Sequence, residues 1–212
     1  IFSILVLIGL IYISNYDYLL NAVSKIYFTG HTTAYIDDFK QFDNNILSQS
    51  KNPQVWPNHE KYNSITLPKA LEAHHKKTQT IAFVIIKNDS IYFEKYYDGY
   101  GPESKSNSFS VAKSYVSALL GKAIMQGYIK SLDQRVKDFI PDLKGLYANE
   151  VTVGDLASMA SGQSWDEAYY SPFSVTTAAY FIKDLDKLIL NQPIDQKPGK
   201  KYVYKSGTTQ LL

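Results

Sequence analysis

The sequence predicts an α/β (α+β) domain in which helices pack against an antiparallel sheet. A short amphipathic pattern over residues 67–78 is typical of a helix. A β-branched run over 81–86 and an alternating run over 90–97 flank Asn88-Asp89, which predicts a β-hairpin. A longer helical pattern then runs from Ser108 to Gly127. The predicted order is therefore a helix, a β-hairpin, a loop and a second helix.

The composition excludes several classes of function. The net charge of +2 comes without a concentrated basic tract, so no nucleic-acid partner is expected. Cysteine is absent, which excludes disulfides and thiolate metal sites. His31 and His59 have no metal-ligand spacing to another His, Asp or Glu, so neither a metal nor a cofactor is expected.

The first residues form an apolar run, and we expect a transmembrane signal-anchor over residues 1–14. The run is shorter than the ~20 residues of a spanning helix and does not begin with Met, so we expect only part of the anchor here. A cleaved signal peptide or a buried core helix are the alternatives. Residues 15–65 read as a tether that partly packs on the domain over 66–212. The anchor would place the domain over 66–212 outside the cytoplasm, in the periplasm.

The helix that begins near Ser108 carries the strongest candidate for chemistry. We expect Ser108 or Ser110 to cap this helix, and Lys113 lies one turn after Ser110. A serine is a weak nucleophile unless a base lies within hydrogen-bond reach, and a lysine can serve. The predicted buried face of this helix comprises Ala112, Tyr115, Val116, Leu119, Leu120, Ala123 and Ile124.

The pattern S-x-x-K is weak by itself, because it also occurs at residues 48–51. That copy lies in a polar stretch before Pro53, with no apolar helix behind it. The context therefore selects Ser110 over Ser48 as the candidate nucleophile.

Helical patterns continue through the rest of the chain. Residues 132–141 predict a short helix stopped by proline, and residues 174–190 predict a further one. A helix that begins at Thr152 has Asp155 three residues on, which is the spacing of a capping box. Another helix begins near Thr208.

Four blocks in this order resemble the serine β-lactamase and penicillin-binding-protein family, in its class C-like, esterase and 6-aminohexanoate-dimer hydrolase branch. The blocks are residues 110–113 (the S-x-x-K motif), 132–141, 151–162 and 198–206. The resemblance covers about residues 66–212. It implies a β-lactamase/transpeptidase-like fold, with an antiparallel sheet flanked by helices and an all-α subdomain.

The chain departs from the family pattern in two places. Ser206 stands where β-lactamases usually carry Asn, and the resulting Tyr-Lys-Ser is similar to the 6-aminohexanoate-dimer hydrolases. The third motif, K-T-G or H-x-G, is absent from these residues, and with it the C-terminal strands that the fold would need.

The resemblance implies acyl transfer on a small ester or amide. Ser110 would attack the carbonyl, and Lys113 and Tyr204 would pass its proton to the leaving group. Which of the two is the base is left open. Ser206 would join this network, and Trp165 and Tyr169 would lie beside the substrate, although core packing explains them equally well.

Three alternatives compete with an esterase or amidase. A β-lactamase or D-Ala-D-Ala peptidase would use the same residues, and a catalytically silent sensor domain would keep the fold alone. A Ser-His-Asp hydrolase is excluded, since there is no G-x-S-x-G and no histidine follows His75.

Overall fold

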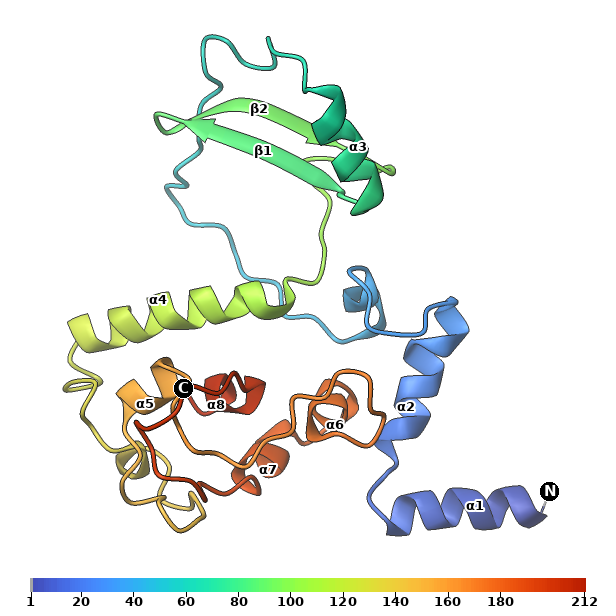
Figure 1. The fold of residues 1–212 in the computed structure, drawn as a ribbon, viewed down its shortest axis with the longest axis vertical. Helices are drawn as coiled ribbons and strands as arrows, with labels where there is room; N and C mark the ends of the chain where they lie inside the picture. The colour runs from blue at the N-terminus through green and yellow to red at the C-terminus, as the bar shows by residue number, and fades with distance from the viewer. Residues whose placement is uncertain (1) are drawn as a thin grey trace. The chain divides into compact units, whose positions relative to one another are not determined.

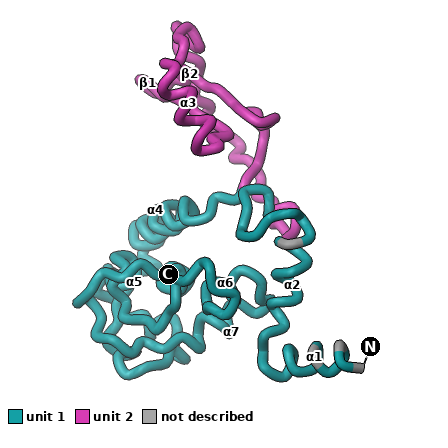
Figure 2. The backbone as a smooth tube through the Cα atoms, turned by 45° about the vertical axis from the view of Figure 1, so that its right-hand side comes forward, with its two compact units in different colours: residues 1–38, 107–212 teal, residues 39–106 magenta. Residues whose placement is uncertain are grey.

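The computed structural model describes residues 2–212, without the side chains of Phe2, Ile4, Leu7 and Tyr27. The chain forms two compact units, which Figure 2 colours separately: residues 1–38 with 107–212, and residues 39–106. The sequence-based boundaries at 14/15 and 65/66 differ from this division and stay predictions. Within residues 2–212 no helix is both long enough and apolar enough to cross a membrane.

The unit of residues 39–106 contains the predicted helix and hairpin (Figure 1). Helix α3 spans Lys69–Lys77, and strands β1 (Ala82–Lys87) and β2 (Ser90–Tyr96) pair antiparallel from Ala82–Tyr96 to Lys87–Ser90. Asn88 and Asp89 both have positive φ, of 49° and 54°, which is the backbone of a tight type I′ hairpin turn. The predicted hairpin is therefore confirmed.

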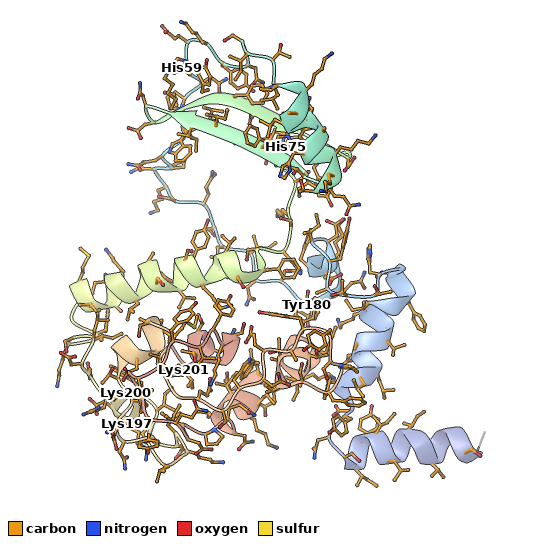
Figure 3. All side chains as sticks on the ribbon, viewed as in Figure 1. His59, His75, Tyr180, Lys197, Lys200 and Lys201 are labelled. Atoms are coloured by element: carbon orange, nitrogen blue, oxygen red, sulfur yellow. The ribbon has the colours of Figure 1, made fainter. Side chains whose placement is uncertain are left out.

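His74 and His75 are adjacent in α3 but have different surroundings: His74 is exposed and His75 is buried. His75, which Figure 3 labels, is 5 % exposed. Its Nδ1 lies 2.8 Å from the Tyr97 hydroxyl. Its ring also packs against Phe83 of β1, with 4.7 Å between ring centroids. Adjacent residues lie about 100° apart around a helix, so one histidine faces the hairpin while its neighbour faces water.

The other unit is helical, and its elements are drawn in Figure 1. They are α1 (Phe2–Ile13), α2 (Tyr18–Lys25), α4 (Ala112–Met125), α5 (Val153–Ala157), α6 (Val175–Phe181), α7 (Leu185–Leu190) and α8 (Ser206–Gln210). Single 3₁₀ turns occur in this unit at Tyr27–Thr29, Phe109–Val111 and Val136–Asp138, and a further turn, Asp38–Gln41, begins at its last residue before the other unit. The helix predicted over 132–141 is thus one 3₁₀ turn.

Of two further helix predictions, one is confirmed and the other is wrong. The capping box at α5 is confirmed: Thr152 Oγ1 accepts from the Asp155 N–H at 3.1 Å, and Asp155 Oδ2 accepts from the Thr152 N–H at 2.9 Å. The single helix predicted over 174–190 is wrong, because α6 and α7 are separate. Asp184 begins α7 by accepting the Lys187 N–H at 3.0 Å, and such a cap interrupts a helix.

A compact core holds the helices of this unit together. Segments 132–165 and 189–211 supply it: Val136, Leu143, Ala148, Val151, Leu156, Trp165, Ile189, Ile194 and Leu211. Gly162 has a φ of +73°, and a Cβ there would lie 2.0 Å from the Gln196 carbonyl oxygen. Only glycine fits that turn, which brings residues 160–163 against residues 194–203.

Hydrogen bonds connect residues 35–38 with the segment that leads into α4. The buried Asp38 carboxylate accepts from the Tyr35 N–H at 2.7 Å and from the Tyr180 hydroxyl at 3.2 Å. Asn107 donates to the same hydroxyl at 2.9 Å, and Figure 3 labels Tyr180 on α6. Burial, together with the nearby Asp38 carboxylate, raises the pKa of Tyr180. This network fixes the chain immediately before Ser110.

Candidate active site

Ser110 lies in the 3₁₀ turn that leads into α4, and its side chain is exposed. The preceding Phe109 has a φ of +44°, a left-handed conformation that is uncommon for a bulky residue and concentrates at functional sites. Neither Ser108 nor Ser110 caps the helix, so that prediction was wrong. The α-helix begins only at Ala112, and the Ser110 hydroxyl contacts Lys113 and Tyr204 instead of capping the helix.

Lys113 belongs to the inward stripe of α4. It shares that stripe with half-buried Val116 and buried Leu120, at spacings of three and four residues. Its Nζ lies 3.3 Å from Ser110 Oγ and 3.2 Å from Ser206 Oγ. The amine therefore bridges the candidate nucleophile and α8.

The buried face predicted for α4 was too wide. Leu120 is buried and Val116, Ala123 and Ile124 are half-buried, but Tyr115 and Leu119 are 69 % and 67 % exposed. The predicted set combined two neighbouring stripes of the helix, of which one faces the rest of this unit.

Tyr204 reaches Ser110 from a segment far along the chain. Its hydroxyl lies 2.6 Å from Ser110 Oγ, and Lys113 Nζ lies 5.1 Å from the centroid of its ring. The segment is held on both sides of Tyr204: the Val203 N–H donates to Met159 O at 2.9 Å, and the buried Lys205 donates to Gln163 O. Burial, reinforced by the positive charge of Lys201, lowers the pKa of Lys205. Lys205 thus anchors the strand-like segment, while Tyr204 faces the nucleophile.

Ser206 joins the same group at the start of α8. It accepts from Lys113, as above, and donates its hydroxyl proton to Glu167 Oε1 at 2.6 Å. Its backbone N–H donates to Glu167 Oε2, also at 2.6 Å. A continuous hydrogen-bonded chain therefore runs from Tyr204 through Ser110, Lys113 and Ser206 to Glu167.

Sequence reasoning missed Glu167. Burial alone would raise its pKa, but the hydrogen bonds from Ser206 and Tyr169 together outweigh burial and lower it. The carboxylate is therefore held ionised one hydroxyl away from the Lys113 amine. The residue pair Asp166-Glu167 beside Trp165 was the available signal, but nothing local distinguishes Glu167 from its neighbour.

The two predicted substrate-side aromatics have different surroundings. Trp165 is 9 % exposed and donates from Nε1 to Thr176 Oγ1 at 2.9 Å, so it is largely a core residue. Tyr169 is 62 % exposed and its hydroxyl donates to Glu167. Burial and this hydrogen bond raise the pKa of Tyr169 to about 12. Both residues line the same cavity as Ser110.

Comparisons with known proteins agree on one family. The family model described as Beta-lactamase matches residues 68–212. A 6-aminohexanoate-dimer hydrolase of Paenarthrobacter ureafaciens is 28 % identical over 104 residues, which are 49 % of this chain and 26 % of that protein.

A solved structure from Bacillus anthracis, provisionally named as a 6-aminohexanoate-dimer hydrolase, shares the fold. It superposes with a TM-score of 0.55 and 19 % identity, over 78 % of this chain and 47 % of that one. The matches therefore span about a quarter and about half of the two relatives. The fold is β-lactamase/transpeptidase-like, as the sequence predicted. The family model covers more than half of the chain, so the chain belongs to the Beta-lactamase family.

Proposed function

We propose that the protein is a serine hydrolase that cleaves esters or amides through an acyl-enzyme on Ser110. One observation carries the proposal: Ser110 Oγ lies within hydrogen-bond distance of both Tyr204 (2.6 Å) and Lys113 (3.3 Å). A serine needs a positioned base to attack a carbonyl, and a catalytically silent domain has no need of two such groups. The hydrolase names of the relatives support the same reading.

The proposed reaction has two halves. Ser110 Oγ bonds to the carbonyl carbon while its proton passes into the Lys113–Tyr204 pair, and the backbone N–H of Ser110 stabilises the oxyanion. The proton then moves to the leaving oxygen or nitrogen as the carbonyl–leaving-group bond breaks. A water molecule attacks the acyl-enzyme in the second half and restores the Ser110 hydroxyl. No metal or cofactor takes part in this scheme.

A fluorophosphonate probe tests the nucleophile in the full-length protein. We expect labelling at Ser110, no labelling after Ser110→Ala, and unchanged labelling after Ser108→Ala or Ser48→Ala. Lys113→Ala and Tyr204→Phe should each lower turnover by about 10²-fold or more, as loss of general acid–base catalysis does. Labelling that persists in Ser110→Ala, or a wild type that is not labelled, contradicts the proposal.

A further inference from the structure

A cavity of about 890 Å³ opens beside Ser110, within the unit of residues 1–38 and 107–212. This volume lies in the upper part of the range for small-molecule sites. Ser110, Lys113 and Ser206 form one part of its wall, and apolar and aromatic side chains form most of the remainder. A substrate group that fills the cavity is therefore bonded to, or in contact with, the carbonyl carbon that Ser110 attacks.

One wall comes from α2, in the stretch that the sequence suggested was a tether. Leu19, Ala22, Val23 and Ile26 line the cavity, at helical spacings of three, one and three residues. The helix is fixed to a neighbouring part of the wall, since the Tyr18 hydroxyl donates to Pro172 O at 2.9 Å. Asn21 Nδ2 also donates to Phe181 O at 3.2 Å, and Figure 1 shows α2 beside α6.

The charges of the wall indicate what the cavity accepts. Among the described residues that line it, Lys113 is the one charged side chain, and it belongs to the reaction centre. No lining carboxylate is therefore present to pair with an ammonium at the far end of a substrate. An apolar chain brings no charged group out of water when it enters such a cavity. An aminoacyl chain would bring its ammonium group out of water, which costs free energy.

The position of Tyr204 indicates which half of a substrate enters. In the proposed mechanism the Lys113–Tyr204 pair delivers a proton to the leaving group. Tyr204 is the member of the pair nearer to Ser110 Oγ, at 2.6 Å against 3.3 Å for Lys113, so we place the leaving group on the side of Tyr204. Tyr204 contacts Ser110 but does not line the cavity. The group on the other side of the carbonyl, the acyl chain, is the one directed into the cavity.

We infer that the cavity is an acyl-chain pocket, and that the preferred substrates carry apolar acyl groups of medium length, such as octanoyl, and not acetyl or 6-aminohexanoyl. The inference rests on the proposed Ser110 chemistry and adds α2 to the binding site. Each CH₂ that the pocket buries should raise kcat/KM about fourfold, which is about 0.8 kcal/mol.

Two isomeric esters test the inference in the full-length protein. Ethyl octanoate and octyl acetate have the same atoms, but only the first carries its long chain on the acyl side. We expect kcat/KM for ethyl octanoate to exceed that for octyl acetate at least tenfold. p-Nitrophenyl hexanoate should likewise exceed its 6-aminohexanoyl analogue. Equal rates, or a preference for octyl acetate or the aminoacyl ester, overturn the inference.

A substitution in α2 tests whether this helix forms part of the cavity wall. Ala22→Trp should lower the ratio of p-nitrophenyl octanoate to p-nitrophenyl acetate hydrolysis at least tenfold. Ser24→Trp, on the exposed side of the same helix, should leave that ratio unchanged. An unchanged ratio in Ala22→Trp contradicts the assignment of α2 to the cavity wall. If Ala22→Trp does not fold, the isomeric esters still decide the inference.

Fluorophosphonate labelling distinguishes a failure of the proposed function from a failure of the acyl pocket alone. A wild type that is neither labelled nor active on any ester overturns the proposed function, and the acyl pocket with it. A wild type that is labelled at Ser110 and hydrolyses esters without regard to acyl length overturns the acyl pocket alone.

Discussion

Ser206 occupies the place of an amide side chain, and its contacts leave it no proton to offer. Its hydroxyl donates to Glu167 and accepts from Lys113, whereas an Asn amide both donates and accepts over a longer reach. The resemblance to β-lactamases implies that an Asn amide at this position would contact the acylamide side chain of a penicillin. We therefore expect the Ser206 network to accept penicillins poorly.

Substrate preference follows from this residue. We expect the full-length protein to hydrolyse p-nitrophenyl butyrate and to turn over nitrocefin poorly or not at all. Steady-state rates on the two compounds, in the wild type and in Ser206→Asn, provide the measurement. Faster hydrolysis of nitrocefin than of the ester, with little effect of Ser206→Asn, would favour a penicillin-interacting enzyme.

Glu167 acts through Ser206, and we expect it to be a positioning residue. Glu167→Gln replaces one accepting oxygen with a donor that faces a Ser206 donor, so kcat/KM should fall about tenfold at neutral pH. Exposed Glu150→Gln is the matched control and should have wild-type activity.

A pH titration separates this role from a general loss of packing. The pKa of Glu167 is lower in the folded protein than its ordinary value of 4.5, so its contribution to stability is present above that pH. The contribution is lost as the pH falls through the lowered value. The difference in unfolding free energy between wild type and Glu167→Gln, from urea titrations, should therefore shrink below about pH 4.5. A difference that is independent of pH would contradict the ionised carboxylate.

Among the elements, the turn at Gly162 packs closely against the segment that leads to Tyr204. It precedes the bridge between Gln163 and Ile194 and so sets the course of the segment that carries Tyr204. The left-handed backbone alone makes Gly162→Ala unfavourable by about 1–3 kcal/mol, and the overlap with Gln196 O adds to this.

Two glycine substitutions should therefore have opposite signs. Gly162→Ala should lower the free energy of unfolding, whereas Gly121→Ala, in the middle of α4 with open space around it, should raise it by up to about 1 kcal/mol. Chemical denaturation of the two variants measures both effects. A stable Gly162→Ala variant would mean that the turn accommodates a side chain.

The elements that the sequence predicted well are those whose cause is local. The Asn88-Asp89 turn and the Thr152–Asp155 capping box depend on contacts within a few residues. The Ser110–Lys113 pair was found for the same reason, because one helical turn brings them together. The break before α7 was local too, but the cap at Asp184 was overlooked within a continuous helical pattern.

The rest of the site depends on contacts that no local pattern reveals. Tyr204 and Ser206 entered only through a family resemblance, and the Glu167 contact spans 39 residues of sequence. The burial of His75 required a tyrosine 22 residues away. The wall formed by α2 depends on hydrogen bonds across more than 150 residues, so the sequence described that segment as a tether.

At the scale of the whole molecule, we propose that the apolar segment over residues 1–13 anchors the protein in a membrane, with its catalytic domain on the outer side. Fractionation of cells that express the full-length protein should recover it with the membranes. A variant that lacks residues 1–13 should leave that fraction. Recovery of the full-length protein in the cytosol would contradict the anchor.

The bonds at Ser110 form over very unequal stretches of chain, and this bears on how activity arises during folding. The Lys113 contact closes over three residues, whereas the Tyr204 contact closes over 94. Closing a long loop carries a larger entropic penalty, and contacts distant in sequence form slowly. We therefore expect the nucleophile and its lysine to pair when α4 forms, and the tyrosine to reach them later. On refolding, helical circular dichroism should return before reactivity toward fluorophosphonate.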